Sequence, residues 1–175
     1  MKKGIIKIQS SRLVLRELCP QDAPWFKALN DDPEVVRYTG DGPFRGLPAA
    51  RAFLEAYPAE AYLRYGMGRW AVCLRTGHQE PLGWCGLKWH PATREADLGF
   101  RLFRRYWGQG FATEAAAACL AYGRGELGLA RIIGRAMAAN RASVRVLEKL
   151  GFVQERQIVF EGQPGLLYRF EDGLP

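Results

Sequence analysis

The chain has 175 residues, 48% of them hydrophobic and 25% charged, which fits one globular domain with a sizeable core. No apolar run is long enough to cross a bilayer, and the N-terminus lacks the apolar core of a signal peptide. We therefore expect a cytoplasmic protein that does not bind membranes. The net charge of +7 comes from scattered basic residues without a nucleic-acid-binding motif, so an acidic or phosphorylated small ligand suits it equally well. Nucleic-acid binding remains the weakest of the alternatives.

Histidine and cysteine are too few and too dispersed to indicate a metal site. The two histidines, His78 and His90, fall in predicted turns, so we expect no metal. The four cysteines form no CxxC pair and each has apolar neighbours, which favours buried, reduced thiols over disulfides. These cysteines are Cys19, Cys73, Cys85 and Cys119.

The first half of the chain predicts a strand, two helices and then three more strands. Alternating apolar residues indicate a strand over 11–17, and Asp22 is a suitable N-cap for a helix over 23–29. After a glycine- and proline-rich loop, a second helix is expected over 49–63, and Pro58 should kink or end it early. Three alternating runs joined by short turns then predict an antiparallel meander. These runs cover residues 69–75, 81–89 and 95–103, with the first turn at 76–78.

The second half alternates helices and strands. An alanine-rich helix is expected from Gly110 to about Tyr122, followed by a strand, a helix that ends at a glycine cap, and two final strands. Their ranges are 131–138, 140–150, 153–160 and 165–170. The order predicts a single α/β (α+β) domain over residues 1–175, with a mixed, mostly antiparallel sheet of about seven strands and about four helices.

A glycine turn between the third strand of the meander and the alanine-rich helix is the most informative stretch. Arg104 and Arg105 precede Gly108 and Gly110, and the helix follows at once. A turn of this kind leaves backbone N–H groups unpaired at the positive end of the helix dipole, which is where phosphate groups bind. The spacing matches neither a P-loop nor a dinucleotide-binding fingerprint. On spacing alone, an ordinary helix-entry turn is an equally good interpretation.

Four blocks of sequence resemble the GNAT (GCN5-related N-acetyltransferase) superfamily, and most closely its ribosomal-protein N-terminal acetyltransferase (RimJ/RimL-type) subgroup. They are SRLVLR at 11–16, NDDPEV at 30–35, ADLGF at 96–100 with YWGQGFATEA at 106–115, and NRASVRVLEKLGF at 140–152. The last two blocks, in this order and spacing, are highly specific, and together the four extend over nearly the whole chain. The resemblance implies a GNAT-like fold in which two central strands splay apart and form an acetyl-CoA cleft.

The resemblance also implies which residues hold acetyl-CoA. Backbone amides from Arg105 through Tyr106, Trp107, Gly108 and Gln109 to Gly110 would bind the pyrophosphate, with Thr113 nearby. The edge of the strand at Phe100, Arg101 and Leu102 would pair with the pantetheine arm and polarise the acetyl carbonyl. Asn140 would hydrogen-bond the pantetheine, and Ser143 would lie near the CoA sulfur. The alternative role of Asn140 is a helix N-cap, and both roles can hold at once.

For the general base that deprotonates the attacking ammonium, Asp97 is the first candidate. It falls on the strand face opposite Leu98 and Phe100. Similar sequences often carry glutamate at this position, so the shorter Asp97 would need a bridging water. The alternative is that Asp97 is a solvated or salt-bridged strand residue.

The acid that protonates the leaving thiolate is harder to place. Many members of the family have a tyrosine at the position that matches Leu147, and leucine cannot donate a proton. Ser143 or water would replace it, with Tyr38 and Tyr106 as further possibilities.

The acceptor pocket would lie between residues 35–40, the second helix and the loop between the last two strands. Aromatic residues could line it, although core packing is the alternative for the tryptophans, and two glutamates could attract an ammonium group. These residues are Tyr38, Trp70, Trp84, Trp89, Glu155 and Glu161.

The resemblance thus implies an acetyl-CoA-dependent N-acetyltransferase that acts on a primary amine, as a monomer or homodimer. The amine could be a protein N-terminal α-amine or a small molecule such as a polyamine, amino acid or aminoglycoside. Because Leu147 replaces the usual acid, a non-catalytic CoA-binding sensor is a further alternative.

Overall fold

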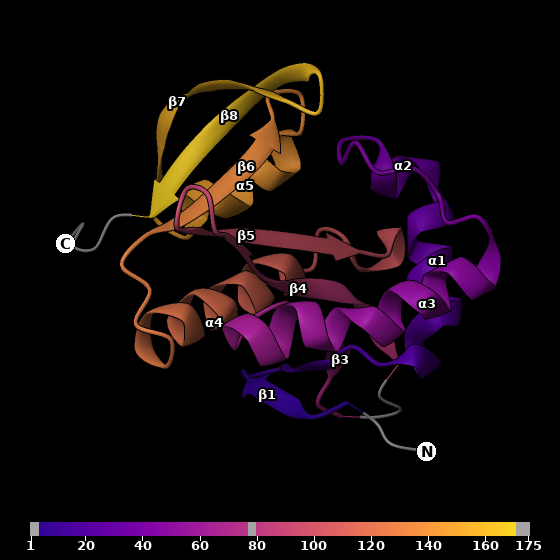
Figure 1. Cartoon of the computed structure of the whole chain (residues 1–175). Helices are drawn as coiled ribbons and strands as arrows, with labels where there is room; N and C mark the ends of the chain where they lie inside the picture. The colour runs from indigo at the N-terminus through magenta and orange to yellow at the C-terminus, as the bar shows by residue number, and fades with distance from the viewer. Residues whose placement is uncertain (1–3, 77–79, 171–175) are drawn as a thin grey trace.

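The computed structural model describes residues 4–76 and 80–170, which form one eight-stranded sheet with helices on both faces. The spatial order of the strands is β1-β2-β3-β4-β5-β6-β8-β7, and all neighbours are antiparallel except β5 and β6 (Figure 1). The strands are β1 (Ile6–Gln9), β2 (Leu13–Glu17), β3 (Arg69–Leu74), β4 (Pro81–His90), β5 (Glu95–Leu102), β6 (Ile132–Met137), β7 (Phe152–Phe160) and β8 (Gln163–Phe170).

The helices follow the expected order. They are α1 (Ala23–Asp31), the short α2 (Pro33–Val36), α3 (Gly46–Pro58), α4 (Phe111–Gly125) and α5 (Arg141–Lys149). At Pro58 the α-helical pattern ends, as predicted, and a π-helical turn (Ala59–Leu63) continues the chain. The predicted mixed fold is therefore confirmed, with one additional strand, β1, and one additional short helix, α2, that the sequence did not reveal. The predicted turn at 76–78 extends beyond the described residues, because Gly77 and His78 lie outside them.

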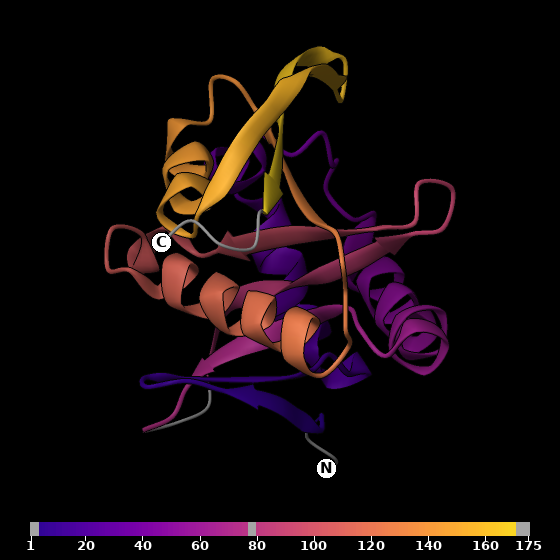
Figure 2. The same ribbon diagram turned by 90° about the vertical axis from the view of Figure 1, so that its left-hand side faces the viewer.

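The strands before the fork alternate their side chains between two hydrophobic cores. Leu13, Leu15 and Trp70 face α4, whereas Val14 and Ala71, the intervening residues of the same strands, face α1 and α3. Figure 2 shows α4 across one face of the sheet with α3 on the other. Because both faces of these strands are covered, this part of the sheet forms a rigid platform on which side chains can be placed accurately.

The sheet divides between β5 and β6, which we call the fork. These strands pair only at Ala96 with Ile132 and at Asp97 with Ile133. Beyond this point β6 turns away with β8, β7 and α5, and Figure 1 shows it rising from β5. The splayed central pair that the resemblance implied is thus present, and the fork leaves one edge of β5 without a neighbouring strand.

A buried ion pair fixes the entrance of α1 against β2. The guanidinium of Arg16 donates two hydrogen bonds to the carboxylate of Asp22, at 2.8 and 2.7 Å, and both side chains are more than nine-tenths buried. Trp25 Nε1 also donates to Asp22 at 2.8 Å. Burial alone would raise the pKa of Asp22, but the hydrogen bonds from Arg16 and Trp25 and the charge of Arg16 outweigh it, so the pKa is lowered.

Candidate active site

The free edge of β5 presents backbone groups to the fork. The N–H of Ala96 points to the carbonyl of Arg131 at the base of the fork, 3.5 Å away. Because backbone groups alternate in direction along a strand, those of Leu98, Phe100 and Leu102 point to the same side, where no strand pairs with them. The amide of Arg101 points the other way, toward β4. Of the predicted β5 contacts, Phe100 and Leu102 therefore present amides to the fork and Arg101 does not.

A cavity of about 220 Å³ lies at the fork and extends over one face of β3, β4 and β5. Its walls come from distant parts of the chain: the segment after α2, strands β3–β6, helix α5 and the turn between β7 and β8. The lining includes Tyr38, Asp41, Arg69, Trp84, Lys88, Asp97, Phe100, Arg101, Arg135, Asn140, Ser143, Leu147 and Glu161. The cavity therefore brings together the predicted base, the predicted acid substitute and part of the predicted acceptor wall.

Asp97 stands at the base of the fork and is held by an arginine from the opposite strand. Arg135 of β6 donates to Asp97 Oδ2 from Nη2 at 2.7 Å and from Nε at 3.1 Å. The second carboxylate oxygen, Oδ1, is buried and has no hydrogen-bond partner among the described residues. The salt-bridged alternative for Asp97 is thus confirmed for one oxygen, while the other has no partner among the described residues.

His90 completes this cluster and was placed wrongly by the sequence analysis. It is the last residue of β4, not part of a turn, and it pairs with Glu95 across the β4–β5 ladder. Arg135 Nη2 lies 2.7 Å from His90 Nε2. Because an arginine can only donate, this nitrogen of His90 must accept, which leaves the proton of a neutral ring on Nδ1. His90 thereby helps to orient the guanidinium that holds Asp97.

A second ion-pair cluster joins the strands of the fork two residues earlier on β5, at Glu95. Arg131, just before β6, donates to Glu95 of β5 at 2.5 Å and to Glu155 of β7 at 2.8 Å. Burial alone would raise the pKa of Glu95, but the hydrogen bond and charge of Arg131 lower it. Glu155, a candidate for attracting an ammonium group, is therefore engaged in this ion pair and does not line the cavity.

Helix α5 contributes the polar groups on the other side of the cavity. The side chain of Asn140 accepts a hydrogen bond from the N–H of Ser143 at 3.2 Å, so Asn140 is the N-cap of α5, in agreement with the alternative role. Its amide nitrogen remains available as a donor. Ser143 is half-buried and lines the cavity, and Leu147, one turn further along, presents only an apolar surface there.

The glycine turn lies at the end of β5, apart from the residues that line the cavity. Gly108 and Gly110 have φ angles of +73° and +78°, which side chains disfavour, and Gly110 is the N-cap of α4. Within residues 4–76 and 80–170, the N–H groups from Gly108 to Thr113 donate to no protein acceptor, and the first helical bond is from Glu114 to Gly110. Six consecutive unpaired N–H groups at a helix N-terminus are suited to an anion, and anion binding at this turn stays a prediction.

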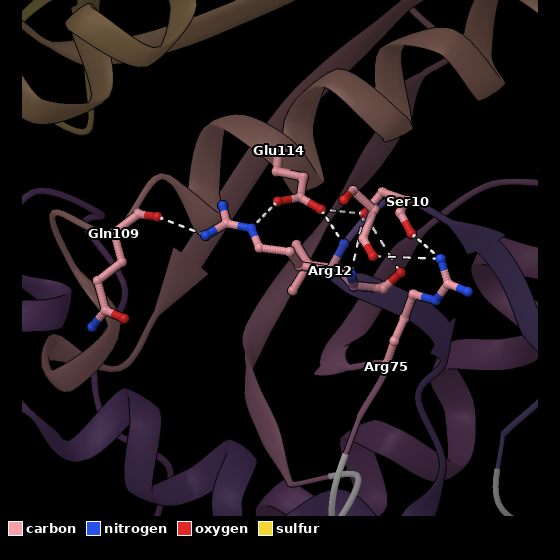
Figure 3. Close-up of polar contacts among 7 residues, drawn as sticks. Ser10, Arg12, Arg75, Gln109 and Glu114 are labelled. Carbon is pink, nitrogen blue, oxygen red and sulfur yellow. Dashed lines mark hydrogen bonds and ion pairs between the residues drawn. The ribbon is translucent and has the colours of Figure 1, made fainter.

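An arginine just before β2 anchors this turn, a role that the sequence did not reveal. Arg12 donates from Nε to Glu114 at 2.6 Å and from Nη1 to the carbonyl of Gln109 at 3.1 Å (Figure 3). Its backbone N–H and the hydroxyl of Ser10 also donate to Glu114, each at 2.7 Å. Burial alone would raise the pKa of Glu114, but these hydrogen bonds and the charge of Arg12 lower it. We call this the Arg12–Glu114 clamp.

The remaining predicted residues of the turn hold one another in place through their side chains. Trp107 Nε1 donates to the carbonyl of Leu102 at 2.8 Å, and the amide of Gln109 donates to the carbonyl of Arg105 at 2.7 Å. Arg105 pairs with Glu80 at 3.0 Å on the surface. Tyr106 packs edge-on against the ring of Phe111 and does not reach the cavity. The turn is thus shaped by its own side chains, and its backbone remains exposed to a ligand.

Of the aromatic residues proposed for the acceptor pocket, two line the cavity and two do not. Tyr38 and Trp84 are in its wall. Trp70 is fully buried against Tyr122 in the core beneath α4, and Trp89 packs against the same core. The difference arises because Trp70 and Trp89 point to the α4 face of the sheet, while Trp84 points to the opposite face. Glu161 lines the cavity, as proposed.

Three further findings concern membrane spans, metal ions and cysteines. In the part of the chain that the structure describes, no helix combines the length and the apolar character needed to span a membrane. Over the same residues, no three histidine, cysteine, aspartate or glutamate side chains gather in a way that could hold a metal ion. All four cysteines are free thiols, and the sulfur atoms of Cys85 and Cys119 lie 3.6 Å apart.

Comparison with known proteins gives the site its family. Residues 12–153 match the acetyltransferase (GNAT) domain family. The uncharacterized N-acetyltransferase YoaA of Bacillus subtilis is 30% identical over 173 residues, which cover 96% of this chain and 90% of the relative. The FsC-acetyl coenzyme A-N(2)-transacetylase of Aspergillus fumigatus is 31% identical over 153 residues, covering 82% of this chain and 63% of that protein.

A solved structure shows the same architecture. The acetyltransferase from Agrobacterium tumefaciens superposes with a TM-score of 0.80 at 25% identity, and the superposition covers 98% of each chain. The family match extends from the Arg12–Glu114 clamp through the fork to the start of β7 and includes each site residue described above except Ser10, Glu155 and Glu161. This chain therefore belongs to the GNAT family and is an acetyltransferase.

Proposed function

We propose that this enzyme transfers the acetyl group of acetyl-CoA to a primary amine, which attacks the thioester directly within the cavity at the fork. The observation that carries the proposal is the juxtaposition at the fork of unpaired β5 amides with the free Oδ1 of Asp97. A reaction of this kind needs a donor that polarises the carbonyl and a base for the amine, and the unpaired amides and the Asp97 carboxylate at the fork suit these two tasks.

The residues present fit acetyl-CoA, which members of the family use as co-substrate and which supplies the acetyl group as a thioester. The N–H groups from Gly108 to Thr113 are suited to the pyrophosphate, and the amides of Leu98, Phe100 and Leu102 to the pantetheine arm. Asn140 lines the same cavity, and its side-chain N–H groups could donate to the pantetheine arm. Arg105, Tyr106, Trp107 and Gln109 support the turn through the side-chain contacts described above.

Protein groups then have three tasks. The N–H of Phe100, or that of its neighbour Leu98, polarises the carbonyl, because a fixed donor stabilises the negative charge that develops on the oxygen. Asp97 Oδ1 takes a proton from the amine, directly or through water. The hydroxyl of Ser143, one helical turn before Leu147 in the cavity lining, protonates the leaving thiolate in place of Leu147, which cannot donate a proton.

Holding the glycine turn in its left-handed conformation should be essential for binding acetyl-CoA. Substituting Gly110→Val should weaken acetyl-CoA affinity about 10- to 100-fold, since a branched side chain at this φ costs about 1–3 kcal/mol and relaxation would move the N–H groups. The added Cβ would also lie 3.4 Å from Arg12 Nη2. Isothermal titration calorimetry with acetyl-CoA measures the change.

The matched control is Gly128→Val. Gly128 has a φ of +60° but lies beyond α4, and a Cβ added there would meet open space. This variant should lose comparable stability while keeping acetyl-CoA affinity. If Gly110→Val bound acetyl-CoA as tightly as Gly128→Val, the glycine turn would not be the phosphate site.

The reaction itself is tested by thiol release from acetyl-CoA with a panel of primary amines and N-terminal peptides. We expect acetyl-CoA to raise the melting temperature of the protein, whereas NAD should not, because a ligand stabilises only the state it binds. Amine-dependent thiol release should accompany this shift. Stabilisation without release for any amine would indicate a CoA-binding sensor, and the absence of a shift at saturating acetyl-CoA would refute the cofactor assignment.

The acceptor class is the finer question. Likeness to the ribosomal-protein subgroup stays a prediction, and the Aspergillus relative carries acetyl coenzyme A and an N(2) position in its name. The charges that line the cavity bear on the choice between a protein N-terminal amine and a small-molecule amine.

A further inference from the structure

The floor of the cavity is one face of β3, β4 and β5, and its register sets the side chains in rows. Lys88 lies opposite Asp97, Gly86 opposite Gly99, and Trp84 opposite Arg101. Arg69 of β3 extends the glycine row, since it pairs with Gly86. Successive rows on one face of a strand are about 7 Å apart. A basic residue thus stands in or beside each row, within reach of a small molecule at Asp97.

Most of the charges around the cavity cancel in pairs, but two cations do not. Arg135 is paired with Asp97 and Arg101 with Asp41. Neither Arg69 nor Lys88 has a carboxylate partner among the described residues, and the unpaired Glu161 is exposed on the opposite wall. The lining therefore carries an excess of positive charge on the side of the sheet.

Contacts with three aromatic residues hold both the backbone and the side chain of Arg69. Its N–H donates to the hydroxyl of Tyr57 at 2.7 Å, and the hydroxyl of Tyr62 donates to its carbonyl. Its guanidinium lies 4.5 Å from the ring centre of Trp84, which is 5% exposed. A stacked guanidinium keeps its N–H groups free for an anion, so Arg69 is preorganised to donate to one.

A second guanidinium lies close to the same tryptophan ring. Arg101 lies 5.4 Å from the Trp84 ring centre, is 7% exposed, and donates to Asn30 and to Asp41. Its Nε is buried without a partner among the described residues. Burial lowers the pKa of Arg101, and the charge of Arg69 lowers it further against the effect of Asp41. An anion bound beside Trp84 would offset the repulsion between the positive charges of Arg69 and Arg101.

We infer that the amine acceptor also carries a carboxylate, which binds at Arg69 beside Trp84 while its amine reaches Asp97. This inference rests on the proposed function and narrows its acceptor to amino acids or peptides with an acidic group near the N-terminus. Polyamines and aminoglycosides should be poor acceptors. Their several ammonium groups would be repelled by the positive charges of Arg69, Lys88 and Arg101, which line the same cavity.

The test compares acceptors that differ only in this charge. Thiol release is measured with the full chain for glutamate against glutamine, phenylalanine against phenylalaninamide, and an amidated peptide with aspartate against asparagine at its second position. Spermidine represents the polycations. In at least one pair, the acidic member should show about tenfold or higher kcat/KM, as a charge-assisted hydrogen bond implies. The pair that responds distinguishes a free amino acid from a peptide.

Variants of Arg69 then test whether the preference for the acidic acceptor depends on this residue. Arg69→Gln should reduce the ratio within the responding pair to below about threefold, whereas Arg69→Lys should keep part of it because the charge remains. The matched control, Arg51→Gln, lies on the exposed surface of α3 and should leave the ratio unchanged. Acetyl-CoA affinity, measured by calorimetry, should be retained in Arg69→Gln, because Arg69 lies away from the glycine turn.

The possible outcomes separate this inference from the proposed function. Turnover of amines without a preference for the acidic member, a preference for spermidine, or a preference that persists in Arg69→Gln would overturn the inference and leave the acetyltransfer proposal standing. If acetyl-CoA bound but no amine of either kind were acetylated, the proposed function would fail and the inference with it.

Discussion

Asp97→Asn should lower kcat about 10²- to 10⁴-fold at pH 7, the range over which a general base contributes, while acetyl-CoA affinity stays the same. Asparagine has nearly the shape of aspartate but cannot take a proton from the amine. The deficit should narrow as the pH rises above about 8, near the pKa of an α-amine, because the acceptor is then mostly neutral. Steady-state kinetics of thiol release between pH 6.5 and 9.5 measures both effects.

A control is needed because Asp97→Asn also removes the partner of Arg135. Glu95→Gln makes the same chemical change two residues earlier on β5 and breaks the ion pair with Arg131, outside the cavity lining. It should retain most of the turnover. If Asp97→Asn kept full activity, or if both variants lost activity equally and independently of pH, Asp97 would have only a structural role.

The second large effect concerns stability. Asp22→Asn should lower the free energy of unfolding by about 3–5 kcal/mol, because it leaves the guanidinium of Arg16 buried without its counter-charge. Asp31→Asn is the matched control. Asp31 pairs with Lys27 at 2.5 Å on the surface of α1, where such a pair contributes about 0–1 kcal/mol. Urea unfolding at pH 7 compares the two variants with the parent protein.

The same ion pair makes a prediction for pH. The pKa of Asp22 is lowered in the folded protein, so its stabilising contribution is complete above the ordinary carboxylate pKa of about 3.9 and is lost as the pH falls further, through the folded value. The difference in unfolding free energy between the parent protein and Asp22→Asn should therefore be constant from pH 5 to 7 and shrink below about pH 4. A difference that did not change with pH would show that Asp22 acts through packing alone.

Local sequence patterns predicted most of the fold, because every helix except the short α2 and every strand but one have a periodic or capped signature of their own. The exception among the strands is β1, whose four residues bury only Ile8 and so leave too short a pattern to recognise. The alternation within each strand correctly grouped Trp70 with Val72, but it could not say which face of the sheet looks toward the cavity. That assignment depends on where α3 and α4 dock, which is a tertiary property.

The sequence likewise predicted the residues of the candidate site that lie in recognisable blocks, but not the residues that pack around them. Asp97, Phe100, Asn140 and Ser143 lie in blocks with a strong signature, and they line the cavity. The groups that fix their environment do not share such a signature. Arg12 and Glu114 are 102 residues apart, and Arg135 meets Asp97 only because β6 follows β5 across the fork. Long-range pairs of this kind arise from strand order, so a single sequence does not reveal them.

The fork also has a consequence for the rate at which the thioester substrate binds. Its opening is set by the point at which the β5–β6 ladder ends, and two arginines of the β6 segment, Arg131 and Arg135, brace it against carboxylates of β5. A cleft formed by strand order does not require a rare open conformer, so no fraction of the molecules is excluded from binding. We expect association to be limited by encounter and orientation rather than by an opening motion, and therefore to be linear in substrate concentration.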